Sequence, residues 1–255
     1  VFNNNGKQQV FIFDIDTKYR TILKIDDLDN NSPLCFNSNY TEICYISQIK
    51  QRKYLTIYNL LTDIKLRLKD LRQCRLESIF WSKNNGIFYS LNLPNSEISR
   101  IECVNTKDMK ISCPLMFTKS GDSSLIGISN DGTYLLCRTT INGINRTCVY
   151  DILSKEMIQF GDGCFNEFPV NFSYDERNIL AIREYQDKKI PIMYTFDSKA
   201  EQILPFDGSS NDDMQFCLDD EFIIFSKQIH SSAFIISLYD LVDNSIETIL
   251  NVGQN

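Results

Sequence analysis

The chain has 255 residues, of which 43% are hydrophobic and 23% are charged. This composition excludes an intrinsically disordered chain, and no apolar run approaches the roughly 18 residues that a transmembrane helix needs. The formal net charge of −7 argues against a nucleic-acid-binding surface over the whole domain, and a single histidine removes most metal sites and most histidine-dependent catalysis.

The chain begins Val1-Phe2-Asn3-Asn4-Asn5-Gly6, with no initiator methionine and no visible signal peptide. Because these residues run directly into a turn, we expect the chain to be part of a longer protein or a larger assembly. Residues 8–25 read as two β-strands, the last two of a four-stranded unit, with Val1-Phe2 at the end of the strand before them. The sequence therefore starts partway through a structural unit.

Two landmarks recur along the chain with one period. The first is an apolar or aromatic residue, a small polar residue, then Asn or Asp and a turn. It begins at Phe36, Trp81, Ile128, Phe172 and Phe216, which are 45, 47, 44 and 44 residues apart. The second is an apolar or aromatic residue, Asp or Asn, then an apolar residue; it begins at Phe13, Tyr58, Tyr150 and Tyr239, with weaker copies at Cys103 and Phe196. A shared period for two landmarks indicates a repeat architecture.

Each repeat contains four short runs of β-forming residues, separated by Asn, Asp, Gly and Ser. Ile64-Lys65-Leu66-Arg67-Leu68 alternates with the period of a strand, and long segments of helical period are absent. The most apolar runs are Ile43–Ile46, Ile87–Tyr89, Tyr134–Cys137, Ile179–Ile182 and Phe222–Phe225. The pattern predicts an all-β chain of four-stranded antiparallel blades, a β-propeller.

Five repeats carry all four strands, here named a to d in chain order. They span about 33–68, 78–112, 125–160, 169–206 and 214–250, after a half-blade at 1–25. We therefore expect one propeller domain over residues 1–255, six-bladed, with its first blade incomplete in this chain. A larger ring or a second domain outside these residues is the alternative, because an open half-blade would expose unpaired strand edges.

The segments Ile128-Ser129-Asn130-Asp131-Gly132 and Tyr150-Asp151-Ile152-Leu153-Ser154 resemble the repeats of TolB-type and Trp-Asp-repeat-like propellers. The propellers of prolyl oligopeptidase relatives share this repeat type. The resemblance covers essentially the whole chain, and its motifs are structural: the Asp caps the turn between strands a and b, and the Gly takes a positive φ. Since the Gly-His dipeptide of Trp-Asp repeats is absent, the TolB-like branch is favoured.

Nine cysteines include three pairs at hairpin spacing, Cys35/Cys44, Cys103/Cys113 and Cys137/Cys148. A two-residue turn at Asn142-Gly143 would place the last pair directly opposite each other. Peptidase-type propellers outside the cell carry hairpin disulfides, so the pairing stays open. The odd count favours free thiols and a cytoplasmic location over a secreted or periplasmic one, as do Cys74, Cys164 and Cys217, which have no evident partner.

Candidate catalytic and metal-binding residues have simpler interpretations. Ser129 lies in a sequence similar to a nucleophile elbow, but it coincides with the repeat landmark and is predicted to be a turn residue. His230 is expected in a solvated loop between strands b and c, at 228–232. The acidic clusters at 26–30 and 211–213 lack the Gly and Glu of a calcium loop, so we expect solvated connections. No catalytic residue, cofactor or metal is expected within the chain.

Charge is unevenly distributed. Residues 50–75 contain eight Lys and Arg against two Asp, so this segment carries +6 and the remainder −13. Since b–c and d–a loops open on the same face of a propeller, we expect a basic patch there for an acidic partner; a merely solvated charged segment is the alternative. Other d–a loops are expected to be acidic, at Asp26, Asp27, Asp29, Asp162, Glu167, Asp212 and Asp213. The predicted partner-binding residues are Lys50, Arg52 and Lys53 in a b–c loop, with Lys69, Arg72 and Arg75 in a d–a loop.

These features favour a non-enzymatic interaction scaffold that binds a protein or peptide through its loop face. The alternative is the substrate-filtering propeller of a prolyl-oligopeptidase-type serine peptidase, whose hydrolase domain would lie outside this sequence. A third possibility, an enzyme or small-ligand binder that uses the central channel, needs polar residues that converge on the innermost strands. The sequence shows no such ring.

Overall fold

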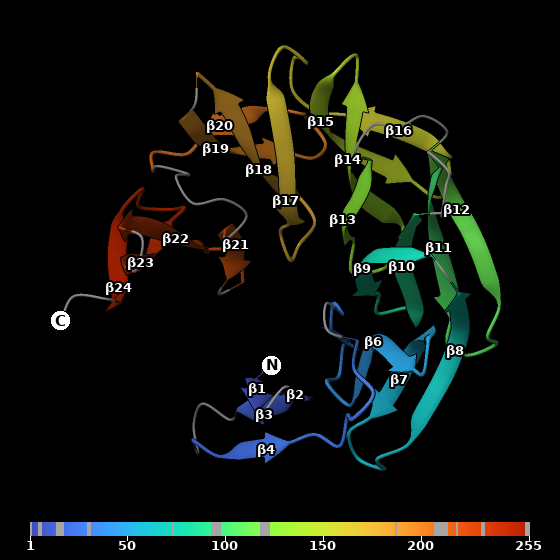
Figure 1. Ribbon diagram of the computed structural model, residues 1–255. Coiled ribbons are helices and arrows are strands. Elements are labelled where there is room, and N and C mark those ends of the chain that lie inside the picture. The colour runs from blue at the N-terminus through green and yellow to red at the C-terminus, as the bar shows by residue number, and fades with distance from the viewer. Residues whose placement is uncertain are drawn as a thin grey trace. The chain divides into compact units, whose positions relative to one another are not determined.

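A computed structural model describes residues 2–4, 7–13, 18–29, 32–72, 74–92, 98–117, 123–186, 188–206, 214–217, 219–230 and 233–252. Every regular element in these ranges is a β-strand, and the strand pairs are antiparallel (Figure 1). No helix of this described part could cross a membrane. The predicted all-β class is therefore confirmed. The chain forms two compact units, Val1–Thr118 and Lys119–Asn255.

The first unit begins with two small sheets. In these, β1 (Phe2–Asn4) pairs with β2 (Lys7–Gln9), and β3 (Phe11–Phe13) pairs with β4 (Arg20–Ile22). Only Val10 separates β2 from β3, so these two strands follow each other almost without a break. Two four-stranded sheets follow: β5 (Cys35–Phe36), β6 (Glu42–Ile49), β7 (Arg52–Asn59) and β8 (Lys65–Arg72), then β9 (Arg75–Trp81), β10 (Gly86–Asn92), β11 (Ser99–Asn105) and β12 (Ile111–Phe117).

The second unit contains three four-stranded sheets. In each of them consecutive strands lie side by side, as Figure 1 shows. The first has β13 (Ser124–Ile128), β14 (Tyr134–Ile141), β15 (Ile144–Asp151) and β16 (Glu156–Gln159); the second has β17 (Asn166–Phe172), β18 (Asn178–Tyr185), β19 (Lys188–Thr195) and β20 (Glu201–Ile203); the third has β21 (Met214–Cys217), β22 (Phe222–His230), β23 (Ala233–Asp240) and β24 (Ile246–Val252). The repeated unit of the sequence is thus a four-stranded antiparallel meander.

Several connections are shorter than the sequence predicted. Only Lys50 and Gln51 separate β6 from β7, and β8 continues to Arg72, so most of the two expected basic loops is strand. His230, expected in a loop, is the last residue of β22 and pairs with Ala233. The reason is that backbone pairing does not depend on side-chain polarity. A polar residue at the end of a strand can keep its ladder hydrogen bonds while its side chain reaches solvent.

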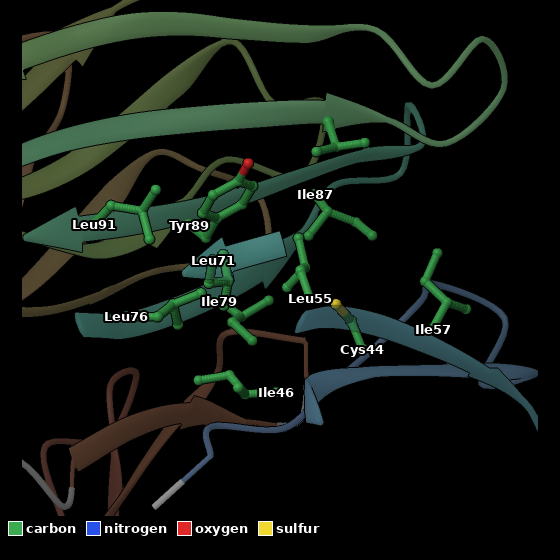
Figure 2. Close-up of a cluster of buried hydrophobic side chains, with 11 residues drawn as sticks. Cys44, Ile46, Leu55, Ile57, Leu71, Leu76, Ile79, Ile87, Tyr89 and Leu91 are labelled. Carbon is green, nitrogen blue, oxygen red and sulfur yellow. The ribbon is translucent and has the colours of Figure 1, made fainter. Parts of the chain in front are cut away.

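The second strand of a four-stranded sheet is apolar without alternation where both of its faces are covered. Residues 43–47 of β6 and 86–91 of β10 are buried without interruption. Figure 2 shows the cluster that these strands build between the β5–β8 and β9–β12 sheets, where Cys44 and Leu55 lie near Ile87. The fourth strands differ. Of the alternating residues 64–68, all but the first lie in β8, but the apolar Leu66 is 48% exposed. An outermost strand has no sheet beyond it to bury its apolar face.

The turns between the third and fourth strands share a left-handed residue that is never Gly. This residue has φ between 55° and 62° at Lys18, Asp63, Met109, Lys155, Lys199 and Asn244. These positions are 44 to 46 residues apart, so the backbone repeats more regularly than the side chains do. A left-handed conformation at a non-Gly residue costs roughly 1–2 kcal/mol.

Lys155→Gly is therefore expected to raise the free energy of unfolding by about 0.5–1 kcal/mol, because the relief of left-handed strain exceeds the added entropy of the unfolded chain. Leu153 is the matched control: it lies in the same turn, is 82% exposed and has no positive φ. Leu153→Gly should lower stability by a similar amount. Urea denaturation of both variants is the measurement, and a Lys155→Gly variant less stable than the parent would contradict the strain argument.

The turns between the first and second strands are closed by side chains. Ser129 Oγ donates to Asp131 Oδ1 at 2.7 Å and accepts from the backbone N–H of Tyr134 at 2.9 Å. The predicted turn role of Ser129 is thus confirmed, as is the positive φ of Gly132, which is 76°. The corresponding residues of the other four-stranded sheets keep a positive φ without Gly: Tyr40, Asn85, Glu176 and Asp220.

In the second unit, these turns are linked from one sheet to the next. The carboxylate of Asp220 accepts hydrogen bonds from the backbone N–H groups of Tyr174 at 2.7 Å and Asp175 at 2.8 Å. Glu176 accepts from the backbone N–H of Asn130 in the same way. The left-handed residues Glu176 and Asp220 thus each supply a carboxylate to the turn one repeat earlier.

Candidate functional site

The predicted basic residues of the first unit lie in the β6–β7 turn and in β7, β8 and β9, and we call them the basic cluster. Lys53 and Arg72 are directly opposed across β7 and β8, and Arg75 begins the next sheet after a two-residue gap. The side chains of Arg72 and Arg75 lie outside the described part of the structure. The structure therefore brings the β6–β7 turn next to the end of β8. The full cluster is Lys50, Arg52, Lys53, Lys69, Arg72 and Arg75.

Two lysines of the basic cluster are paired with buried carboxylates. Lys53 Nζ lies 2.9 Å from Asp29 Oδ2, and Lys69 pairs with Glu102. Asp29 and Glu102 are only 9% and 4% exposed, so these ion pairs belong to the packing of the unit. Exposed cationic charge remains at Lys50 in the turn and at Arg52, whose side chain is 73% exposed and lies 3.9 Å from the partly exposed Asp70.

A cavity of about 440 Å³ lies in the second unit, between the β13–β16 and β17–β20 sheets. Its lining contains five apolar side chains and three charged ones. The apolar residues come from β13, β17 and β18, and the charged ones from β14, β18 and β19. The lining residues are Ile126, Arg138, Phe168, Pro169, Val170, Ile182, Glu184 and Lys189.

Two β-bulges shape this cavity. The register of β13 against β14 shifts between Leu125 and Gly127, and that of β17 against β18 shifts between Pro169 and Asn171. The extra residues are Ile126 and Val170, which both line the cavity. They are 44 residues apart, so they occupy the same place in successive repeats. A bulge bends a strand and redirects its side chains, which explains why two neighbouring innermost strands face one cavity.

The charged residues lie toward the turn between the second and third strands. Glu184 of β18 and Lys189 of β19 are directly opposed on either side of the turn. The guanidinium carbon of Arg138 lies 5.9 Å from the centre of the Phe168 ring, within the range of a cation–π contact. The lining thus holds two cations and one carboxylate beside an apolar wall.

A buried ionic network occupies the opposite face of the same strands. Arg183 Nη2 donates to Glu167 Oε1 at 2.7 Å and to Glu201 Oε2 at 2.6 Å, and Tyr194 Oη donates to Glu167 Oε1 at 2.8 Å. Glu167 was predicted in an acidic loop, but it lies in β17 and is 2% exposed. Burial raises the pKa of Glu167, and the hydrogen bonds from Arg183 and Tyr194 oppose this rise. The network fixes the strands that carry Phe168, Ile182 and Glu184.

The cysteines are free thiols in the structure. Cys137 and Cys148 are directly opposed, as predicted from the Asn142-Gly143 turn, and Cys35 is directly opposed to Cys44. The third pair is not, because a register shift places Ser112 opposite Cys103. Burial raises the pKa of the Cys103 thiol to about 11, so this thiol is protonated and unreactive at neutral pH.

Within the described ranges, no three His, Cys, Asp or Glu side chains are placed to hold a metal ion. Asp26 and Asp27, from the first acidic cluster, both pair with Lys65. The second cluster, residues 211–213, lies outside the described residues, as does the side chain of His230.

The cavity was not predicted because a ligand site was expected to need polar residues on the innermost strands. Arg138, Glu184 and Lys189 come instead from second and third strands. The sequence signal for the two bulges that shape the cavity was weak. Pro169 and Gly127 are poor strand formers in otherwise β-forming runs, and such residues often mark bulges.

No protein-family model matches the sequence, and no curated protein sequence matches it. Solved structures do match the fold. TolB from Acinetobacter baumannii superimposes with a TM-score of 0.71 at 12% identity over 97% of this chain. The chain has the fold of a TolB-type β-propeller. It spans 60% of the length of that TolB chain.

Other propellers of this type have different names and chemistries. Oligogalacturonate lyase from Vibrio parahaemolyticus matches with a TM-score of 0.67 at 12% identity, covering 97% of this chain and 73% of its own. The β-propeller domain of the trilobed protease from Pyrococcus furiosus matches with a TM-score of 0.66 at 12% identity, covering 95% and 74%. At such identities the likeness establishes the TolB-type propeller fold alone.

Proposed function

We propose that this propeller is a non-enzymatic interaction domain that binds a protein or peptide partner, with the cavity of the second unit as its main contact. The observation that carries the proposal is the cavity itself. Its volume of about 440 Å³ falls in the range of ligand-binding sites. Its apolar wall can bury one or two side chains of a partner, and its charged residues can fix their orientation.

We further propose that the basic cluster of the first unit attracts an acidic region of the partner. Lys50 and Arg52 are exposed, and charge of this kind increases association rates more than it increases affinity. Lys53 and Lys69 contribute less, because buried carboxylates already neutralise them. Binding through this cluster should weaken with added salt.

Selection of a random peptide library on the purified chain tests the main contact. We expect the selected peptides to lose at least tenfold in affinity for the Arg138→Glu, Lys189→Glu variant, because it replaces both cations of the cavity with carboxylates. The matched control is Lys188→Glu, an exposed neighbour of Lys189 that does not line the cavity. Selected peptides that bind the cavity variant and the parent equally would contradict the proposal. The variant Lys50→Glu, Arg52→Glu tests the basic cluster in the same assay at two salt concentrations.

The second candidate function is the substrate-filtering propeller domain of a prolyl-oligopeptidase-type serine peptidase. The likeness to the propeller domain of the trilobed protease supports it. This function requires a hydrolase domain with a nucleophile elbow and a histidine in the same reading frame. The full-length coding sequence is the test, and a frame without such a domain would exclude this candidate.

A further inference from the structure

We infer that the cavity recognises a peptide carboxylate that lies next to an apolar side chain. This inference rests on the proposed function, and it adds the chemistry of the group that is bound. Its basis is that two cationic side chains and an apolar wall line the same cavity, although the net charge of the chain is −7.

The charges of the lining favour an anionic group. Arg138 and Lys189 supply two positive charges, and Glu184 supplies one negative charge. Glu184 is directly opposed to Lys189 across the hairpin, so the backbone places these two residues side by side. Arg138 lies across the cavity on the other sheet, where the Phe168 ring supports its guanidinium. A carboxylate that enters the cavity can pair with the guanidinium of Arg138, the group that matches its planar two-oxygen geometry best.

The apolar wall defines the rest of the ligand. Ile126 and Val170 come from the two bulges, and Phe168, Pro169 and Ile182 surround them. A branched aliphatic side chain buried against such a wall is stabilised because its apolar surface is removed from water. A polar ligand without such a side chain would leave this wall exposed to water, so a free inorganic anion is a poor match.

A peptide can supply this chemistry in two ways. The carboxylate can be the C-terminus of an apolar last residue, or it can be the side chain of an Asp that precedes an apolar residue. Three acetylated tripeptides distinguish them: acetyl-Gly-Gly-Leu with a free carboxylate, its C-terminal amide, and acetyl-Gly-Asp-Leu amide. Binding is measured by titrating each tripeptide into the isotope-labelled chain and following the backbone amide signals of residues 184–189 by NMR.

We expect at least one carboxylate-bearing tripeptide to bind ten to a hundred times more tightly than the neutral amide, since a hydrogen bond to a charged group contributes roughly 1.5–3 kcal/mol. The tripeptide that binds more tightly identifies the source. Arg138→Met should reduce its affinity to that of the neutral amide. Arg177→Met is the control, because the side chain of Arg177 is 81% exposed and lies in a turn outside the cavity.

Equal affinity of the neutral and charged tripeptides, or no change at residues 184–189 with either charged one, would overturn the inference. The library selection tests the proposed function separately. If library-selected peptides still require Arg138 and Lys189 but bind without any carboxylate, the cavity is a peptide site and only the carboxylate is wrong. If no selected peptide depends on these two residues, the proposed function fails as well.

Discussion

Arg183→Met is expected to lower the free energy of unfolding by about 3–5 kcal/mol, the largest effect of any substitution considered for this chain. Glu167 is 2% exposed, and Arg183 donates to its Oε1 through both Nε and Nη2. Removing the guanidinium leaves a buried carboxylate whose remaining partner is Tyr194. Chemical denaturation of the parent and the variant is the measurement.

The loss should depend on pH. Burial already raises the pKa of Glu167, and Arg183 opposes this rise, so the variant raises that pKa further. A group whose pKa is higher in the folded state stabilises the fold at low pH, and this contribution disappears as the pH rises through the folded pKa. The difference between parent and variant should therefore be smaller at pH 5 than at pH 8. A difference that grows toward low pH would contradict this assignment.

The double variant Arg183→Met, Glu167→Gln controls for lost packing. It removes the unpaired charge together with the guanidinium, so we expect it to recover part of the stability that Arg183→Met loses. If the double variant is as unstable as the sum of the two single variants, the two groups are not coupled. The ionic network would then not be what fixes the strands beside the cavity.

Gly161→Ala is expected to lower the free energy of unfolding by about 3 kcal/mol, through backbone strain and overpacking together. Gly161 has a φ of 73°, and a Cβ there would lie 2.7 Å from Glu167 Oε1 and 2.8 Å from Tyr194 Oη. Both neighbours are held by the ionic network and cannot move aside cheaply. Gly143 is a close control, because its φ is 79° but no atom lies within 4 Å of its Cβ position.

Gly143→Ala should therefore lose only about 1 kcal/mol, the cost of a left-handed alanine. Thermal unfolding of both variants against the parent measures the difference between them. Equal losses would mean that Glu167 and Tyr194 yield to the added methyl group, and that the network is less rigid than its hydrogen bonds indicate.

The repeat could be predicted from the sequence because both the buried strands and the turns recur with its period. Ile179–Ile182 is apolar throughout since both faces of its strand are buried, and Asp131-Gly132 marks a turn whose geometry favours those residues. The copies that lack Gly were less visible. Glu176 and Asp220 adopt the same positive φ, and their carboxylates are held by backbone N–H groups one repeat away. Contacts between repeats leave no local signature in the sequence.

The cavity could not be predicted for a similar reason. Its form depends on bulges at Ile126 and Val170, and a bulge changes the register of a strand without changing its composition. The basic cluster shows the opposite difficulty. Its residues are obvious in the sequence, but the carboxylates that neutralise Lys53 and Lys69 lie 24 and 33 residues away along the chain.

The most direct test of the account is hydrogen exchange of the chain with and without a library-selected peptide, followed by mass spectrometry. If the cavity is the binding site, protection should increase in the segments that line it, residues 124–128, 138–141, 166–171 and 182–189. The Arg138→Glu, Lys189→Glu variant should show no such increase. Protection confined to other segments, or unchanged exchange in these four, would contradict the claim that the cavity binds the partner.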